Sequence, residues 1–137
     1  MPKQYFNPPN LFQSQQYGFS QIVKVTGGAT IYFSGQVGWD ENQILTGGSD
    51  LAAQTRGAFE NLQKAVQVAG GEMHDIVSLR IYVVNYKYSE SSIISDCLLK
   101  FFPADALPVT TWLGVQTLAR PELLIEIEAV AVLDDTL

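Results

Sequence analysis

Two carboxylates within an apolar segment are the residues of this sequence that most suggest chemistry. Glu126 and Glu128 interrupt the apolar run 123–133, and in a strand they fall on the same face because alternate residues point the same way. Carboxylates in such surroundings must be paired, hydrogen-bonded or close to water. The spacing alone favours an ion pair buried at an interface between subunits. The alternative is a carboxylate in a cleft that orients water or moves a proton.

The other reactive residue types point to structural roles. His74 is the only histidine and lies before an expected strand, so we expect a solvated side chain, and a metal site with two histidines is excluded. Cys97 is the only cysteine and falls within the apolar stripe of an expected helix, which favours an inert, buried thiol. A single cysteine cannot form an internal disulfide, which fits a reducing compartment. We therefore expect no metal and no cysteine nucleophile.

Composition and charge limit the partners. The 137 residues are 47% apolar and 16% charged, a balance typical of one globular domain spanning 1–137. Lys and Arg number 8 against 14 Asp and Glu, and no stretch concentrates them, so nucleic acid and anionic membranes are disfavoured as partners. The first residues lack the apolar core of a signal peptide, and the longest apolar run is too short to span a bilayer. We expect a cytoplasmic protein.

Hydrophobic periodicity predicts two helices and five or six strands. The Gly-Gly pair at 27–28 predicts a hairpin between the first two strands, while Gly70-Gly71 and Pro103 are expected to end the helices. Residues up to about Tyr17 show no period and are expected to form an extended arm. The strands are expected at 21–25, 30–34, 76–84, 109–115 and 123–133, with a short run at 36–39, and the helices from Ser49 or Asp50 to Ala69 and from Ser89 or Glu90 to Phe102.

Each expected helix links two strands, which predicts crossovers that place both helices on the same face of one mixed sheet, an α+β fold. One face of strands 76–84 and 123–133 is apolar and suits the helices, with Ile76 assigned to the other face. That second face is still largely apolar, and nothing in the chain remains to cover it. An uncovered face of this kind usually marks an interface, so we expect a closed oligomer.

Short motifs follow one another along nearly the whole chain. They are FSQ at 19–21, YFSGQV at 32–37, QTR at 54–56, ENL at 60–62, AGG at 69–71, DIV at 75–77 and IEIEAVA at 125–131. In this order and combination they resemble the RidA family, also called YjgF or "L-PSP endoribonuclease".

The resemblance implies a chorismate-mutase-like α+β fold and a homotrimer whose sheets face inward, with three clefts between subunits. It also implies hydrolysis of reactive 2-imino acids and enamines to keto acids and ammonia, with no cofactor or metal. In active members an arginine grips the substrate carboxylate, as a bidentate guanidinium can. A glutamate of the last strand positions the attacking water.

Part of the family's site carries over to this sequence. The glutamate falls on Glu126, and the serine and glycine of the loop fall on Ser34 and Gly35. The resemblance thus implies that Glu126 orients water or a substrate N–H, and that Ser34 and Gly35 provide neutral hydrogen bonds.

The rest of the family's polar shell is altered. Threonine stands at position 110, where the family has its arginine, so the resemblance is to a branch that lacks this residue. Trp112 stands where the family has a neighbouring cysteine. Phe19 replaces the tyrosine of the family's first motif, and Ser95 replaces the asparagine of its second helix. Thr110 can still hydrogen-bond, and Phe19 and Trp112 can form an apolar wall. Without the fixed positive charge, a ligand less anionic than a 2-imino acid is expected.

The residues and the family resemblance are compatible with several functions. We favour a trimer that binds a small molecule at its clefts and hydrolyses imines or enamines weakly or with a redirected specificity. An active 2-iminobutanoate/2-iminopropanoate deaminase is the alternative if Arg80 replaces the missing arginine, although Arg80 is more readily explained by pairing with Glu126 or Glu128. A non-catalytic trimer that senses a ligand or binds a protein is a third. A ribonuclease ranks last because the chain is acidic and has one histidine.

Overall fold

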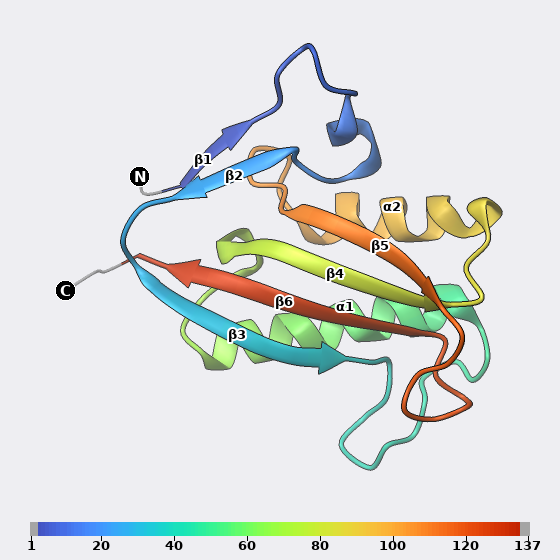
Figure 1. The fold of residues 1–137 in the computed structure, drawn as a ribbon. Coiled ribbons are helices and arrows are strands. Elements are labelled where there is room, and N and C mark those ends of the chain that lie inside the picture. Colours follow the sequence, from blue (N-terminus) through green and yellow to red (C-terminus); the bar gives the residue numbers. More distant parts are fainter. Residues whose placement is uncertain (1–2, 135–137) are drawn as a thin grey trace.

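A four-stranded sheet with two α-helices on one of its faces forms the centre of the computed structural model, which describes residues 3–134 (Figure 1). The strands are β1 (Lys3–Phe6), β2 (Ile22–Val25), β3 (Ala29–Gln36), β4 (Ile76–Val84), β5 (Val109–Val115) and β6 (Ile125–Leu133). The α-helices are α1 (Leu51–Val68) and α2 (Ser91–Phe101), and the 3₁₀ helices are η1 (Ser14–Tyr17), η2 (Met73–Asp75) and η3 (Tyr88–Glu90).

The main sheet has the strand order β3-β6-β4-β5. Strand β6 is antiparallel to both of its neighbours, whereas β4 and β5 are parallel. Helix α1 therefore connects β3 to β4, and α2 connects β4 to β5, and both helices lie on the same side of the sheet (Figure 1). The predicted α+β fold, with a mixed sheet and two helices on one face, is confirmed.

The core lies between the helices and the sheet because the apolar stripes of both elements meet there. Its buried residues come from both helices and from β4 and β6, and they include Phe59, Leu62, Ile81, Ile94, Leu98, Ile125 and Ile127. Asp50 caps α1 by accepting a hydrogen bond from the Ala53 N–H at 3.0 Å. After α1, Gly70 adopts a φ of +94°, which glycine tolerates. The predicted ends of α1 are thus confirmed.

The predicted hairpin between 21–25 and 30–34 is wrong. Strand β2 pairs with β1, with Ile22 opposite Phe6 and Val25 opposite Lys3, whereas β3 pairs with β6. Gly27 and Gly28 have φ values of +71° and +82°, and they turn the chain from one sheet into the other. A glycine pair allows such a corner as readily as a hairpin. The supposed arm supplies β1 as the partner strand.

Two further local predictions need correction. The short run expected at 36–39 is not a strand of its own, since β3 ends at Gln36 and Trp39 forms only an isolated bridge with Leu45. A register shift between Ile76 and Ser78 turns Ile76 into the core, although simple alternation placed it on the other face.

No helix in the part of the chain described here is both long and apolar enough to cross a bilayer.

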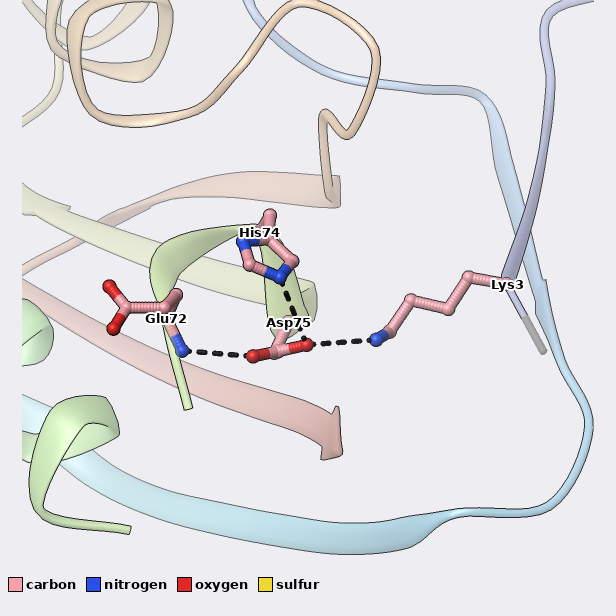
Figure 2. A network of polar contacts seen from close by, with 4 residues as sticks. All are labelled: Lys3, Glu72, His74 and Asp75. Carbon is pink, nitrogen blue, oxygen red and sulfur yellow. Dashed lines mark hydrogen bonds and ion pairs between the residues drawn. The ribbon is translucent and has the colours of Figure 1, made fainter. Parts of the chain in front are cut away.

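A buried ion pair attaches β1 to the start of β4. The Lys3 Nζ lies 3.1 Å from Asp75 Oδ1, and the two side chains are only 3% and 12% exposed. Asp75 also accepts the Glu72 N–H at 2.9 Å and lies 3.5 Å from His74 Nε2 (Figure 2). His74 itself is exposed, as expected, but it belongs to η2.

Replacing Lys3 with Met should lower the free energy of unfolding by about 3 kcal/mol, because it leaves the Asp75 charge buried without its partner. The double variant Lys3→Met/Asp75→Asn should recover part of this loss, since no uncompensated charge remains. Urea unfolding measures both, and Lys24→Met, at an exposed position of β2, is the control. If Lys3→Met costs no more than Lys24→Met, the ion pair does not stabilise the fold.

Candidate functional site

Glu126 lies on the sheet face that the helices leave open. In the register of β4 and β6 it is opposite Tyr82, and its neighbours along β6, Ile125 and Ile127, are buried on the helix side. Together with Gly35, Tyr82, Leu118 and Glu128 it lines a cavity of about 320 Å³. This cavity is a candidate for half of a functional site.

Gly35 makes room for the Glu126 side chain. A Cβ built at position 35 would overlap the carboxylate and lie 2.7 Å from both Cγ and Cδ of Glu126. Only a residue without a side chain allows the carboxylate to fold over the β3 backbone in this way. The sequence suggested a hydrogen-bonding role for Gly35, whereas the structure gives it a steric one.

The two carboxylates of β6 have different partners. The Tyr82 hydroxyl donates a hydrogen bond to Glu128, and this bond raises the pKa of the phenol because the phenol must keep its proton to donate it. Among residues 3–134, Glu126 accepts no hydrogen bond from another side chain, and neither carboxylate forms an ion pair within one protomer. Glu126 is therefore available to a ligand or a water molecule. The ion pair that the spacing favoured is not formed within residues 3–134 of one protomer, and an ion pair between subunits stays a prediction.

Arg80 and Ser34 also lie at the open side of the sheet. Arg80 is exposed, stands opposite Glu128 in the strand register and lines a separate hollow with Ser78. Ser34 is exposed on β3 next to Gly35. Within the protomer, neither lines the cavity that contains Glu126.

The buried side chain of Gln54 holds the turn that leads into β6. Its fully buried side chain donates hydrogen bonds to the carbonyls of Gly48 and Glu122 and accepts one from the Leu124 N–H, at 2.9 to 3.0 Å. One amide thus connects α1, the loop before it and the turn that leads into β6. It acts as a positioning residue for the strand that carries Glu126, a role that the motif at 54–56 did not reveal from the sequence.

A second cavity, of about 330 Å³, lies on the other side of the sheet, at its β5 edge beside α2. Thr110 and Trp112 reach it because they are in register with the core residues Leu79 and Ile81. The cavity is lined by Tyr17, Phe19, Tyr86, Tyr88, Ser91, Ser95, Thr110 and Trp112.

Packing between η1 and α2 brings the first aromatic residues into this cavity. Gly18, with a φ of +97°, lies against α2 so closely that a Cβ would be 2.5 Å from Leu98 Cβ. The Ser14 hydroxyl donates to the Phe19 carbonyl at 2.8 Å, and the Phe19 ring packs edge-on against Trp112 with centroids 5.8 Å apart. The indole N–H of Trp112 donates to Thr110 Oγ1 at 2.9 Å.

The structure therefore divides the predicted site residues into two groups. Phe19, Ser95, Thr110 and Trp112 line one cavity, while Glu126 and Gly35 line the other. Because Thr110 and Glu126 point to opposite sides of one sheet, a single protomer does not bring them together.

Sequence reasoning missed Tyr17, Tyr82, Tyr86 and Tyr88. A signal was present for two of them, since Tyr86 and Tyr88 are large aromatic residues in a polar segment just before a helix.

Burial raises the pKa of the Cys97 thiol, which disfavours a nucleophilic thiolate there, although the side chain is only half-buried. Within residues 3–134, no group of three His, Cys, Asp or Glu side chains could hold a metal ion.

Comparison with known proteins gives consistent matches. The family model described as endoribonuclease L-PSP matches residues 13–133. A 2-iminobutanoate/2-iminopropanoate deaminase of Dermatophagoides farinae is 30% identical over 118 residues, which cover 85% of this chain and 86% of that protein. The crystal structure of YyfB, a Rid family protein of unknown function from Yersinia pestis, has a TM-score of 0.93 and 40% identity, covering 97% of this chain and 100% of that one. RidA from Psychrobacter sp. PAMC 21119 has a TM-score of 0.69 and 26% identity, covering 84% and 88%.

Gly35→Ala should displace the Glu126 carboxylate without unfolding the protein, because the clash is with a flexible side chain. A crystal structure of the variant should show a different Glu126 rotamer, and its free energy of unfolding should change by about 1 kcal/mol or less. Ser34→Ala, at the adjacent exposed position, is the control and should leave Glu126 in place. An unmoved Glu126 in Gly35→Ala would contradict the steric role.

Proposed function

The chain belongs to the endoribonuclease L-PSP family, also known as RidA/YjgF, and we propose that it acts as a homotrimer that binds a small molecule without a carboxylate at clefts between subunits. The observation that carries this proposal is the separation of the two cavities. A complete site, with Glu126 and the aromatic cavity facing one ligand, requires two copies of the chain.

The arrangement of the two half-sites favours a ring. They lie on different surfaces of the protomer, so joining them uses a head-to-tail interface, and such interfaces generate closed rings when the rotation permits. The open sheet face offers a surface for this contact, since it presents the exposed Tyr32 and the half-buried Val84 and Val130 beside Glu126. A trimer is the ring expected for the family.

The ligand follows from the charges of the cavities. Among the residues that the structure describes, no Lys, Arg or His lines the cavity with Thr110 or the cavity with Glu126. The Thr110 oxygen already accepts the Trp112 N–H, so its hydroxyl offers one neutral donor in place of a guanidinium. Desolvating a carboxylate there would be costly, because no positive charge compensates for its lost hydration.

Weak or redirected hydrolysis of an imine or enamine is the chemistry that these groups can support. Glu126 would accept a proton from a water molecule as the water oxygen forms a bond to the imine carbon. The nitrogen takes this proton to give a carbinolamine. As the hydroxyl group of the carbinolamine loses its proton and becomes the carbonyl, the nitrogen takes a second proton, the C–N bond breaks, and ammonia or an amine leaves. Thr110 and Ser34 would orient the ligand, and Gly35 would leave room for the Glu126 carboxylate. Phe19 and Trp112 would exclude water, and Ser95 would contribute a hydroxyl. No cofactor takes part.

A second candidate function is an active 2-iminobutanoate/2-iminopropanoate deaminase in which Arg80 holds the carboxylate. The placement of Arg80 on the same sheet face as Glu126 favours this alternative. The relative from Dermatophagoides farinae bears this activity in its name. The two candidates differ in which residue, if any, binds the carboxylate.

Introducing the missing charge separates the two candidates. With enzymatically generated 2-iminopropanoate, Thr110→Arg should raise kcat/KM at least tenfold, because a guanidinium then compensates the carboxylate, and Arg80→Ala should have little effect. Thr26→Arg adds the same charge at a position that lines neither cavity and is the control. Family-level turnover in the wild type that Arg80→Ala abolishes would favour the second candidate.

Assembly provides an independent test. Analytical ultracentrifugation should give the mass of a trimer, and Val130→Arg, on the open sheet face, should shift the protein to monomers. Glu126→Gln should keep the trimer and abolish any residual imine hydrolysis. A stable wild-type monomer at micromolar concentration would refute the shared cleft, and turnover unchanged in Glu126→Gln would exclude the catalytic role of Glu126.

A further inference from the structure

Five aromatic side chains dominate the cavity at the β5 edge. They are Tyr17, Phe19, Tyr86, Tyr88 and Trp112, and together they are called the aromatic box here. We propose that the aromatic box binds a small organic cation, such as a substituted ammonium or an iminium ion, rather than an anion. This inference rests on the proposed function because it names the ligand class of one half of that site.

The composition of the box favours a cation. Its remaining lining residues are Ser91, Ser95 and Thr110, so its polar groups are hydroxyls and the Trp112 N–H, and none of the described residues that line it is charged. Aromatic rings attract cations through their negative faces, and the attraction grows when the cation leaves water. An anion in the same place would meet electron-rich rings and neutral hydroxyl donors, with no positive charge to compensate for its lost hydration.

Two of the five rings, those of Phe19 and Trp112, are held in place by contacts with neighbouring side chains. Phe19 packs against Trp112 on one side and against Phe12 on the other, with centroid distances of 5.8 and 6.1 Å. The Trp112 N–H is already used in its hydrogen bond to Thr110, so a ligand is left with the apolar surface of the indole. These two rings therefore lose little side-chain entropy when a ligand enters.

The carboxylate of Glu90 weakens the attraction that the first turn of α2 would have for an anion. Helix α2 begins at the box, and the positive end of a helix could attract an anion. Glu90, however, is the residue that precedes α2, and its carboxylate accepts the Lys87 N–H at 3.0 Å at this same end. In the proposed ring, Glu126 of a second copy would add a further negative charge opposite the box.

The size of the cavity limits the ligand. Its volume of about 330 Å³ is at the lower end of the range of about 300 to 1,000 Å³ for small-molecule sites. A cation with a few small hydrocarbon groups fits this space. A protonated imine of similar size is also the form of an imine that water attacks most readily, which connects the box with the chemistry proposed for Glu126.

Three probes of similar size and different charge test the inference. Choline, 3,3-dimethylbutan-1-ol and 3,3-dimethylbutanoate share a branched head group but carry a positive, zero and negative charge. Calorimetric titration of the full chain should show choline binding about tenfold more tightly than the alcohol, with the carboxylate weakest. Equal or tighter binding of the alcohol or the carboxylate overturns the inference, and so does the absence of saturable choline binding.

A pair of variants assigns the preference to the box. Tyr88 is 87% exposed, so its replacement should not disturb the fold. Tyr88→Leu should reduce choline affinity several-fold and leave the alcohol unchanged, whereas Tyr88→Phe should keep the preference because it keeps the ring. An equal effect of Leu and Phe, or an equal loss for choline and the alcohol, would contradict a cation–π contribution.

The two proposals can fail separately. All five rings come from one protomer, so choline preference in a monomeric protein without imine turnover would support the box and refute the shared cleft. A trimer with Glu126-dependent turnover but no preference for choline would support the proposed function and refute the cation site.

Discussion

The alternation of side chains across the main sheet determines which residues of this protein face the helices and which face the open side. Helices α1 and α2 cover only one face of the β3-β6-β4-β5 sheet, so every second residue of β4 and β6 faces away from the core. The same alternation sends Thr110 toward the helices and Glu126 away from them. One geometric constraint therefore creates both an uncovered face and two separated cavities, and in the proposed function it connects ligand binding with assembly.

Two glycines and one buried amide set the positions of the residues that line the two cavities. Gly35 lets the Glu126 carboxylate fold against the backbone of the neighbouring strand, and Gly18 lets η1 approach α2 until Phe19 meets Trp112. Gln54 holds the turn that leads into β6. None of these residues need touch a ligand. Each sets the position of one that could, and a change at any of them should act through geometry.

The residue at position 110 gives the site its electrostatic character. Threonine, fixed by the Trp112 indole, leaves a cavity of rings and hydroxyl groups where a guanidinium would have provided a full charge. Without that charge, desolvation is the main barrier to an anionic ligand. In the proposed cation site the aromatic rings would reverse the preference, because their electrostatic attraction to cations survives the loss of water.

The sequence by itself determined the helices, the strands of the main sheet and their two faces, because these follow from local periodicity and from capping residues such as Asp50 and Gly70. The motifs also indicated Glu126 and the change at Thr110. Only the tertiary structure decided that β2 pairs with β1, that a register shift turns Ile76 inward, and that Tyr17, Tyr86 and Tyr88 join Trp112 around one cavity. Pairing partners and cavities depend on contacts between segments far apart in the chain, and local patterns carry no information about which segments meet.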